Sequence, residues 1–301
     1  MKGSRFSAGR AKALLLSLSV GAAGGVLFHI TGLPLAWMLG PLVANLLVSA
    51  KGVKVEVPES LRSVFLAVMG MVLGSQVTPE LAHRVLDWPI SAVLLLTGVA
   101  ASTAVASAWY RRCGFDPVSA WFGASPGAMT AMIMLGDRCG GDPQRIAIAQ
   151  SLRIVLVILF LPPLFWAFEG GEGALGPADT VLTDGWLLLA IPLLLPLGKW
   201  LRLPSPALLA PLLATALLSG LDIASLALPS WGMNLMLWVL GSAIGSRFQG
   251  MTRRLLGRYL WQSGVATLLA LVVLAVFAEL IHQTVGVGRD VALLALAPGG
   301  I

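Results

Sequence analysis

The chain has 301 residues, of which 57% are hydrophobic and 11% are charged, and its net charge is +6. Soluble domains carry about 25% charged residues, so this composition excludes an ordinary soluble domain. No Asp, Glu, Lys or Arg occurs between Ala13 and Ala50, and a bilayer span needs only about 20 mainly apolar residues. We therefore predict an all-α polytopic membrane protein, since a transmembrane β-barrel would show alternating segments of about ten residues instead.

Apolar runs with few charges follow one another along the whole chain and predict helices. These predicted helices are 13–30, 35–50, 61–77, 90–110, 145–168, 185–201, 203–220, 230–246 and 259–283. Two further apolar segments, 117–137 and 290–301, contain Pro-Gly, so we expect each to be a broken or re-entrant element. The more polar segments 78–88 and 247–258 are expected to be either short helices at the membrane surface or solvated connectors.

An internal repeat is visible in three places. The matching pairs are LPLAWMLGPLVANLLVS (33–49) with LPSPALLAPLLATALLS (203–219), GMVLGS (70–75) with GSAIGS (241–246), and SPGAM (125–129) with APGGI (297–301). The longest pair agrees at eight of 17 positions, and the offset between the copies stays nearly constant along the chain. This steadiness indicates a duplication.

The duplication divides the chain into three predicted parts. They are a first membrane repeat at 1–168, a periplasmic linker at 169–184, and a second membrane repeat at 185–301. The second copy ends just after its Pro-Gly-Gly, so we expect it to be truncated at its broken helix.

The second repeated pair is a GxxxG pattern in both copies, Gly70 to Gly74 and Gly241 to Gly245. Glycines at this spacing let two membrane helices approach closely. We expect them to pack helices together within one chain. A dimer interface is the alternative, which leaves a homo-oligomer possible.

The positions of Lys and Arg predict the orientation of the chain, because cytoplasmic loops carry an excess of both. Suppose that the N-terminus is cytoplasmic and that 117–137 enters the membrane and returns. All of the 20 Lys and Arg except Arg84 and Arg289 then lie near the cytoplasmic face. We therefore expect a multi-pass protein of the bacterial inner membrane with a cytoplasmic N-terminus. The alternative, a full crossing by 117–137, would move Arg253 and its neighbours outside.

With this topology the two copies run in opposite directions, as in the inverted repeats of many secondary transporters. Proline and glycine in mid-membrane free backbone groups, which must face protein or water. We predict that the two breaks form one site for a small molecule or ion, which makes the fold transporter-like. The candidate substrate-binding residues are Ser125, Pro126, Gly127, Ala128, Pro298, Gly299, Gly300, Gln150, Arg153 and Asn45.

Simpler interpretations of these residues stay open. Pro and Gly also serve as kinks or close-packing points in membrane helices. Arg153 is near enough to the predicted cytoplasmic end of its helix to extend its charge to the membrane surface.

No catalytic or metal site is predicted. The three histidines are separated and no acidic residue lies in mid-membrane, whereas an oxygenase metal needs clustered His or carboxylate ligands. We expect no enzyme activity and no cofactor. The basic residues flank apolar runs and no DNA-binding motif is present, so membrane lipids rather than nucleic acid are the expected partners. Cys113 and Cys139 fall in loops predicted to be cytoplasmic and are expected to be reduced thiols.

Nearly the whole chain resembles the AbrB-type membrane protein family, built from an AbrB duplication. The likeness rests on LPLAWMLGPLVANLL, on GASPGAMTAMIMLGD with GDPQRIAIAQSLRIVLV, and on LALAPGGI. The resemblance implies a distant relation to cation/proton antiporters with inverted repeats and broken helices. It also implies an acidic residue after the second Pro-Gly-Gly, where this chain ends. Members carry labels as ammonia monooxygenases or as regulators of gene expression. The residues argue against the first label, while a membrane sensor acting indirectly on gene expression is the alternative to a transporter.

Overall fold

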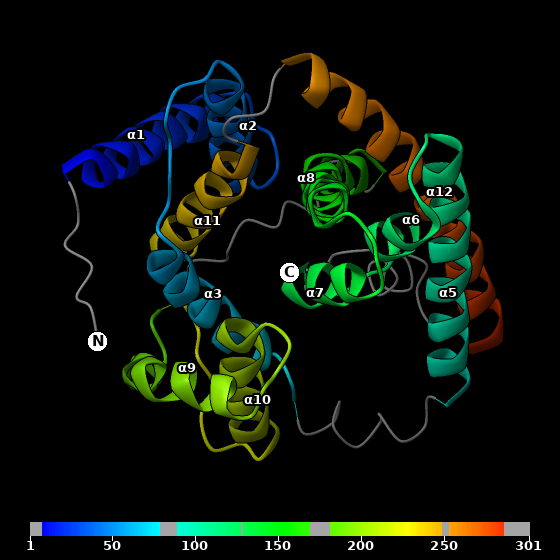
Figure 1. The fold of residues 1–301 in the computed structure, drawn as a ribbon. Coiled ribbons are helices and arrows are strands. Elements are labelled where there is room, and N and C mark those ends of the chain that lie inside the picture. Colours follow the sequence, from blue (N-terminus) through cyan, green and yellow to red (C-terminus); the bar gives the residue numbers. More distant parts are fainter. Residues whose placement is uncertain (1–7, 79–88, 128, 169–180, 249–252, 286–301) are drawn as a thin grey trace. The chain divides into compact units, whose positions relative to one another are not determined.

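The computed structural model describes residues 8–78, 89–127, 129–168, 181–248 and 253–285. Helices make up its regular structure there (Figure 1), and one isolated antiparallel bridge joins Thr183 to Ala227. The elements are α1 (Ala8–Ile30), α2 (Ala36–Ala50), α3 (Glu59–Gly74), α5 (Pro89–Arg112), α6 (Pro117–Ala124), α7 (Met129–Arg138), α8 (Pro143–Phe168), η2 (Gly185–Ala190), α9 (Ile191–Trp200), α10 (Pro206–Gly220), α11 (Ser230–Gly245), η3 (Ser246–Phe248) and α12 (Arg253–Val285).

Four described helices are long and apolar enough to cross a membrane. Their candidate spans are Gly9–Ile30, Ala92–Arg112, Pro143–Pro163 and Leu255–Thr284. Three shorter apolar stretches, Ala36–Ala50, Gly185–Trp200 and Pro206–Gly220, accompany them. The all-helical, membrane-like architecture predicted from the sequence is therefore confirmed, although fewer helices reach spanning length than the apolar runs indicated.

The chain forms two compact units. The first unit contains Met1–His83 and Pro162–Arg253, and the second contains Arg84–Leu161 and Arg254–Ile301. Each unit thus takes segments from both halves of the sequence. The predicted repeat boundaries at 168 and 185 do not coincide with the boundaries of these units, because helices of one half pack on helices of the other.

The first unit contains the same local design twice. Helices α2 and α10 each have 15 residues, with a proline at the sixth position, Pro41 and Pro211. Each follows a residue in the left-handed backbone region, Leu35 with φ 49° and Ser205 with φ 58°. In both helices, the side chain four residues after the proline donates to the proline carbonyl. Asn45 Nδ2 does so at 3.0 Å and Thr215 Oγ1 at 2.9 Å.

Each GxxxG pattern packs on the proline-containing helix from the other half of the sequence. In α3, Gly70 and Gly74 lie against the carbonyls of Leu208 and Leu212 in α10. In α11, the equivalent glycines lie against the equivalent carbonyls of α2. The glycines and the carbonyls that they contact are Gly70 with Leu208, Gly74 with Leu212, Gly241 with Met38, and Gly245 with Leu42.

A Cβ atom at any of these four glycines would collide with a backbone carbonyl, so only glycine permits this approach. The prediction that both patterns pack helices within one chain is confirmed.

In the second unit, α5 and α12 lie side by side and antiparallel (Figure 1). Leu94 and Leu95 of α5 pack on the cluster of Leu274, Ala278 and Ile281. Towards the other end of the pair, Trp109 Nε1 donates to the carbonyl of Gln262 at 3.0 Å, and Tyr110 donates its hydroxyl to Ser263 Oγ at 3.2 Å.

The prediction of a separate surface helix over 247–258 was wrong for residues 253–258. Residues Arg253–Arg258 begin α12, which continues to Val285 without interruption. The cluster of arginines marks the polar end of this long helix. The other predicted surface helix, 78–88, lies outside the described residues except for Thr78. The second broken element, 290–301, lies wholly outside them.

We predict that Gly74→Ala and Gly245→Ala each lower the free energy of unfolding by about 1–3 kcal/mol, because each forces two packed helices apart. Thermal unfolding of the detergent-purified chain measures the effect. Gly257→Ala is the control, because a Cβ there meets nothing within 4 Å, and replacing an exposed helical glycine is neutral or stabilising. Equal stability of all three variants would contradict the close packing.

Candidate functional site: the interrupted hairpin of the second unit

Helices α6 and α7 occupy the segment predicted to be broken. Helix α6 ends at Ala124 and α7 begins at Met129. At 1.5 Å per residue they are only about 12 and 15 Å long, so neither crosses a hydrocarbon core of about 30 Å. The segment is therefore not one continuous spanning helix.

Helix α7 runs back alongside α6, so the last residues of α7 lie beside the first turn of α6. A Cβ on Gly136 would lie 3.4 Å from the ring of Phe122, and one on Gly141 would lie 3.2 Å from Ser119 Oγ. The backbone N–H of Asp142 donates to Ser119 Oγ at 2.7 Å. Helices α6 and α7 thus form a hairpin whose two open ends lie together. We call them the base of the hairpin, and residues 125–127 its tip.

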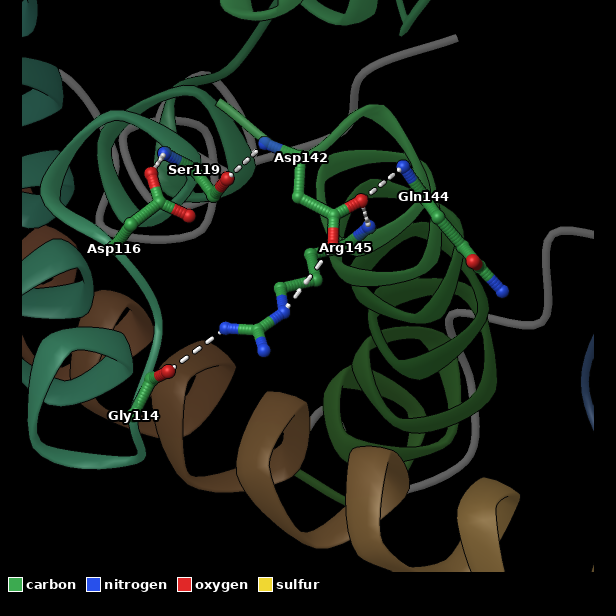
Figure 2. A network of polar contacts seen from close by, with 6 residues as sticks. All are labelled: Gly114, Asp116, Ser119, Asp142, Gln144 and Arg145. Carbon is green, nitrogen blue, oxygen red and sulfur yellow. Dashed lines mark hydrogen bonds and ion pairs between the residues drawn. The ribbon is translucent and has the colours of Figure 1, made fainter. Parts of the chain in front are cut away.

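Two aspartates begin the helices that meet at the base (Figure 2). Asp116 is the N-cap of α6 and accepts the backbone N–H of Ser119 at 2.8 Å. Asp142 Oδ1 accepts the backbone N–H of Gln144 at 2.9 Å and that of Arg145 at 3.3 Å. Its carboxylate thus binds the free N–H groups at the start of α8, as that of Asp116 does for α6. Each Asp precedes a proline, the residue preferred at the first position of a helix.

Arg145 completes the base. Its Nη1 donates to the carbonyl of Gly114 at 2.8 Å, its Nε lies 3.3 Å from Asp142 Oδ2, and its guanidinium stacks 5.5 Å from the centre of the Phe115 ring (Figure 2 shows the polar contacts). Partial burial acts to raise the pKa of Asp116, but hydrogen bonds from Ser119 and the charge of Arg145 outweigh it and lower that pKa. Asp116 is therefore held as a carboxylate at neutral pH.

Two side chains of α8 hold the tip. Gln150 Nε2 donates to the carbonyls of Phe122 at 2.7 Å and Ser125 at 3.0 Å. Arg153 Nη1 donates to the carbonyls of Ala124 and Ser125, both at 3.0 Å. These carbonyls belong to the last turn of α6, where no further helical N–H is available to them. The carbonyls freed by the break are therefore bound by the protein's own donors.

Arg153 and Gln150 also bind each other, since Arg153 Nη2 donates to Gln150 Oε1 at 3.0 Å. Arg153 is only 5% exposed and Gln150 is fully buried. Arg153 lies ten residues into α8, about 15 Å from the start of the helix. Its guanidinium is buried and bound to carbonyls of the hairpin, which favours a role within the protein over snorkelling.

The charge of Arg153 is not neutralised by any described carboxylate. The ion pairs found in the described part of the chain are Arg62 with Glu59 and Arg145 with Asp142. Arg153 Nε is buried and has no hydrogen-bond partner there. A guanidinium offers five N–H donors, and three hydrogen bonds are accounted for. Within the described residues, the Nε–H and one further N–H of this buried cation therefore have no acceptor.

The predicted site residues are only partly brought together. Ser125, Gln150 and Arg153 are in direct contact at the tip, and Pro126 and Gly127 lie in the same interruption. Ala128, Pro298, Gly299 and Gly300 lie outside the described residues. The meeting of two breaks in one site therefore stays a prediction.

Asn45 belongs to the first unit and binds other residues. Its Nδ2 donates to the carbonyls of Ser17 and Pro41, and its Oδ1 accepts the hydroxyl of Ser17 at 2.9 Å. These bonds join α1 to α2, so a packing role accounts for all its contacts.

The sequence-based prediction omitted the base of the hairpin. Asp-Pro occurs before α6 and again before α8, and an N-cap residue followed by proline is a recognisable start signal. Nothing in the sequence shows that the two starts are adjacent in space. Within the described residues, no group of three or more His, Cys, Asp or Glu could hold a metal ion.

Comparisons with known proteins now give the family. The model of the family described as "Transition state regulatory protein AbrB" matches residues 7–301, so the chain belongs to the AbrB family. The chain is similar to "Putative regulator AbrB" of Escherichia coli (strain K12), with 29% identity over 96% of this chain and 83% of the relative. It is also similar to "Uncharacterized protein YhjN" of Bacillus subtilis (strain 168), with 26% identity over 94% and 82%. No solved structure is found to match the chain.

We predict that Gln150→Leu destabilises the chain by about 1–3 kcal/mol, because it leaves the buried carbonyl of Phe122 without its side-chain donor. Gln144→Leu is the matched control, since Gln144 is exposed on the same helix. Thermal unfolding of the two purified variants, compared with the parent chain, tests this. A Gln150→Leu variant as stable as the control would show that the tip does not need the amide.

Proposed function

We propose that the chain is a multi-pass secondary transporter or permease of the bacterial inner membrane, which binds a small solute at the tip of the α6–α7 hairpin. The observation that carries this proposal is the buried pair of Gln150 and Arg153 at the interruption. A charged residue in the middle of an apolar spanning helix is costly, and such residues usually mark a pathway or a binding site. Broken helices at the site are a recurring feature of transporters.

The reciprocal packing in the first unit supports an inverted duplication. Equivalent glycines contact equivalent carbonyls at an offset of 170 or 171 residues, and the proline-containing helices begin in the same way. In this proposal the second Pro-Gly element, around Pro298, supplies the other side of the site. The N-terminus is cytoplasmic, and the linker 169–184 is periplasmic.

The alternative is a membrane sensor that affects gene expression through a partner protein. The names of the family model and of the E. coli relative favour it. A transporter moves solute in proteoliposomes that contain only this protein. A sensor moves none and copurifies with its partner. No enzyme activity is part of either proposal.

We predict that Gly127→Leu abolishes solute uptake by reconstituted full chain while leaving membrane insertion unchanged. A Cβ on Gly127 would meet only the flexible side chain of Met132, so the protein should still fold, while the larger leucine fills the interruption. The same change at Gly299 is expected to have the same effect.

Gly257→Leu, on an open face of α12, is the control and should leave uptake unchanged. Uptake unaffected by Gly127→Leu in correctly inserted protein would contradict a binding role of the tip.

A further inference from the structure

Arg153, at the tip of the hairpin, has no anionic partner among the residues that the structure describes. Arg153 is 5% exposed, and its hydrogen-bond partners are the neutral oxygens of Ala124, Ser125 and Gln150. The carbonyls at the end of α6 carry partial negative charge, which offsets only part of a full positive charge. A buried charge left without a counter-charge is strongly unfavourable.

The unused donors of Arg153 identify the kind of partner that is missing. Nε is buried and has no acceptor among the described residues. Two oxygens of a carboxylate fit two N–H groups of a guanidinium, whereas a neutral amide offers one acceptor oxygen and no charge. Ala120, Ala124 and Ala149 belong to a hydrophobic cluster of the same unit, together with Tyr110 and Phe115, and this cluster contains no carboxylate.

We infer that the solute bound at the hairpin tip is a small organic carboxylate paired with Arg153, whose guanidinium is held in place by Gln150. This inference deepens the proposed transport function and rests on the same site. The carboxylate supplies the missing charge, and the carbonyls of Ala124 and Ser125 hold the guanidinium in position to receive it. Gln150 accepts a hydrogen bond from Arg153 Nη2 and donates to the carbonyls of Phe122 and Ser125, which ties the guanidinium to the hairpin.

The test compares solutes that differ only in charge. Detergent-purified full chain is heated with acetate, propionate or benzoate, and separately with acetamide, propionamide or benzamide, at constant ionic strength. A ligand that binds the folded chain stabilises it by RT ln(1 + [L]/Kd), so the melting temperature rises as the ligand concentration exceeds the dissociation constant. We expect at least one carboxylate to stabilise the chain more than its amide. No preference for any carboxylate over its amide would overturn the inference.

Three variants assign the preference to Arg153. Arg153→Met should remove it, since losing one member of a buried charged contact weakens binding at least about 30-fold. Arg153→Lys keeps the charge without the planar fork, so the preference for carboxylates should remain with weaker binding. Arg145→Gln removes a charge from the base of the hairpin and should leave the preference intact.

If Arg153→Met does not fold, the comparison of Arg153→Lys with Arg145→Gln decides the assignment. Weaker carboxylate binding in Arg145→Gln than in Arg153→Lys would overturn it.

Uptake of the same carboxylate into proteoliposomes separates this inference from the proposed function. Binding that depends on Arg153 without any uptake supports the carboxylate site and contradicts transport. Uptake of an amide that is blocked by Gly127→Leu, without carboxylate binding, supports transport and overturns the carboxylate inference.

Discussion

Backbone hydrogen bonding is the constraint on which this structure depends. Inside hydrocarbon no water is available, so an interrupted helix must find partners for its freed groups within the protein. Here α8 supplies them, because Gln150 and Arg153 bind the carbonyls of Phe122, Ala124 and Ser125. The tip is therefore held by a rigid helix, and the base is tied to the start of the same helix through Ser119 and Asp142. A site built in this way keeps its geometry and also carries a buried positive charge.

In the first unit, polar side chains within apolar helices also bind backbone carbonyls. Asn45 and Thr215 each donate to the carbonyl of the proline four residues earlier in the same helix. Thr215 Oγ1 also lies 3.0 Å from the carbonyl of Met71, which joins α10 to α3. Glycines bring the backbones close enough for such contacts, as between Gly74 and Leu212. The same arrangement appears in both halves of the sequence, at the residues that carry the predicted repeat.

Much of this architecture follows from the sequence, and the exceptions have physical causes. The apolar runs predict the helices because each must bury its backbone polar groups in regular structure, and GxxxG predicts packing within the chain. The sequence does not tell whether Arg153 is buried, because its distance from the start of α8 fits either snorkelling or burial, and its partners lie on the hairpin, 28 and 29 residues earlier in the chain. Asn45 is a predicted site residue because a polar group in an apolar run is costly; its hydrogen-bond partner Ser17 lies 28 residues away in the chain and is not evident from the sequence. The start of α12 at Arg253 was missed because a cluster of arginines resembles a surface segment.

The most direct test of the central claim, that the hairpin enters and leaves on one side of the membrane, uses two native cysteines. Cys113 precedes α6 and Cys139 follows α7, and both are free thiols. Single-cysteine variants, Cys113→Ser and Cys139→Ser, are treated with a membrane-impermeant maleimide in right-side-out and in inverted vesicles. The account predicts that both thiols react in the inverted vesicles only. Labelling of the two thiols from opposite faces would mean that the segment crosses the bilayer, and the hairpin with its buried arginine would not exist as described.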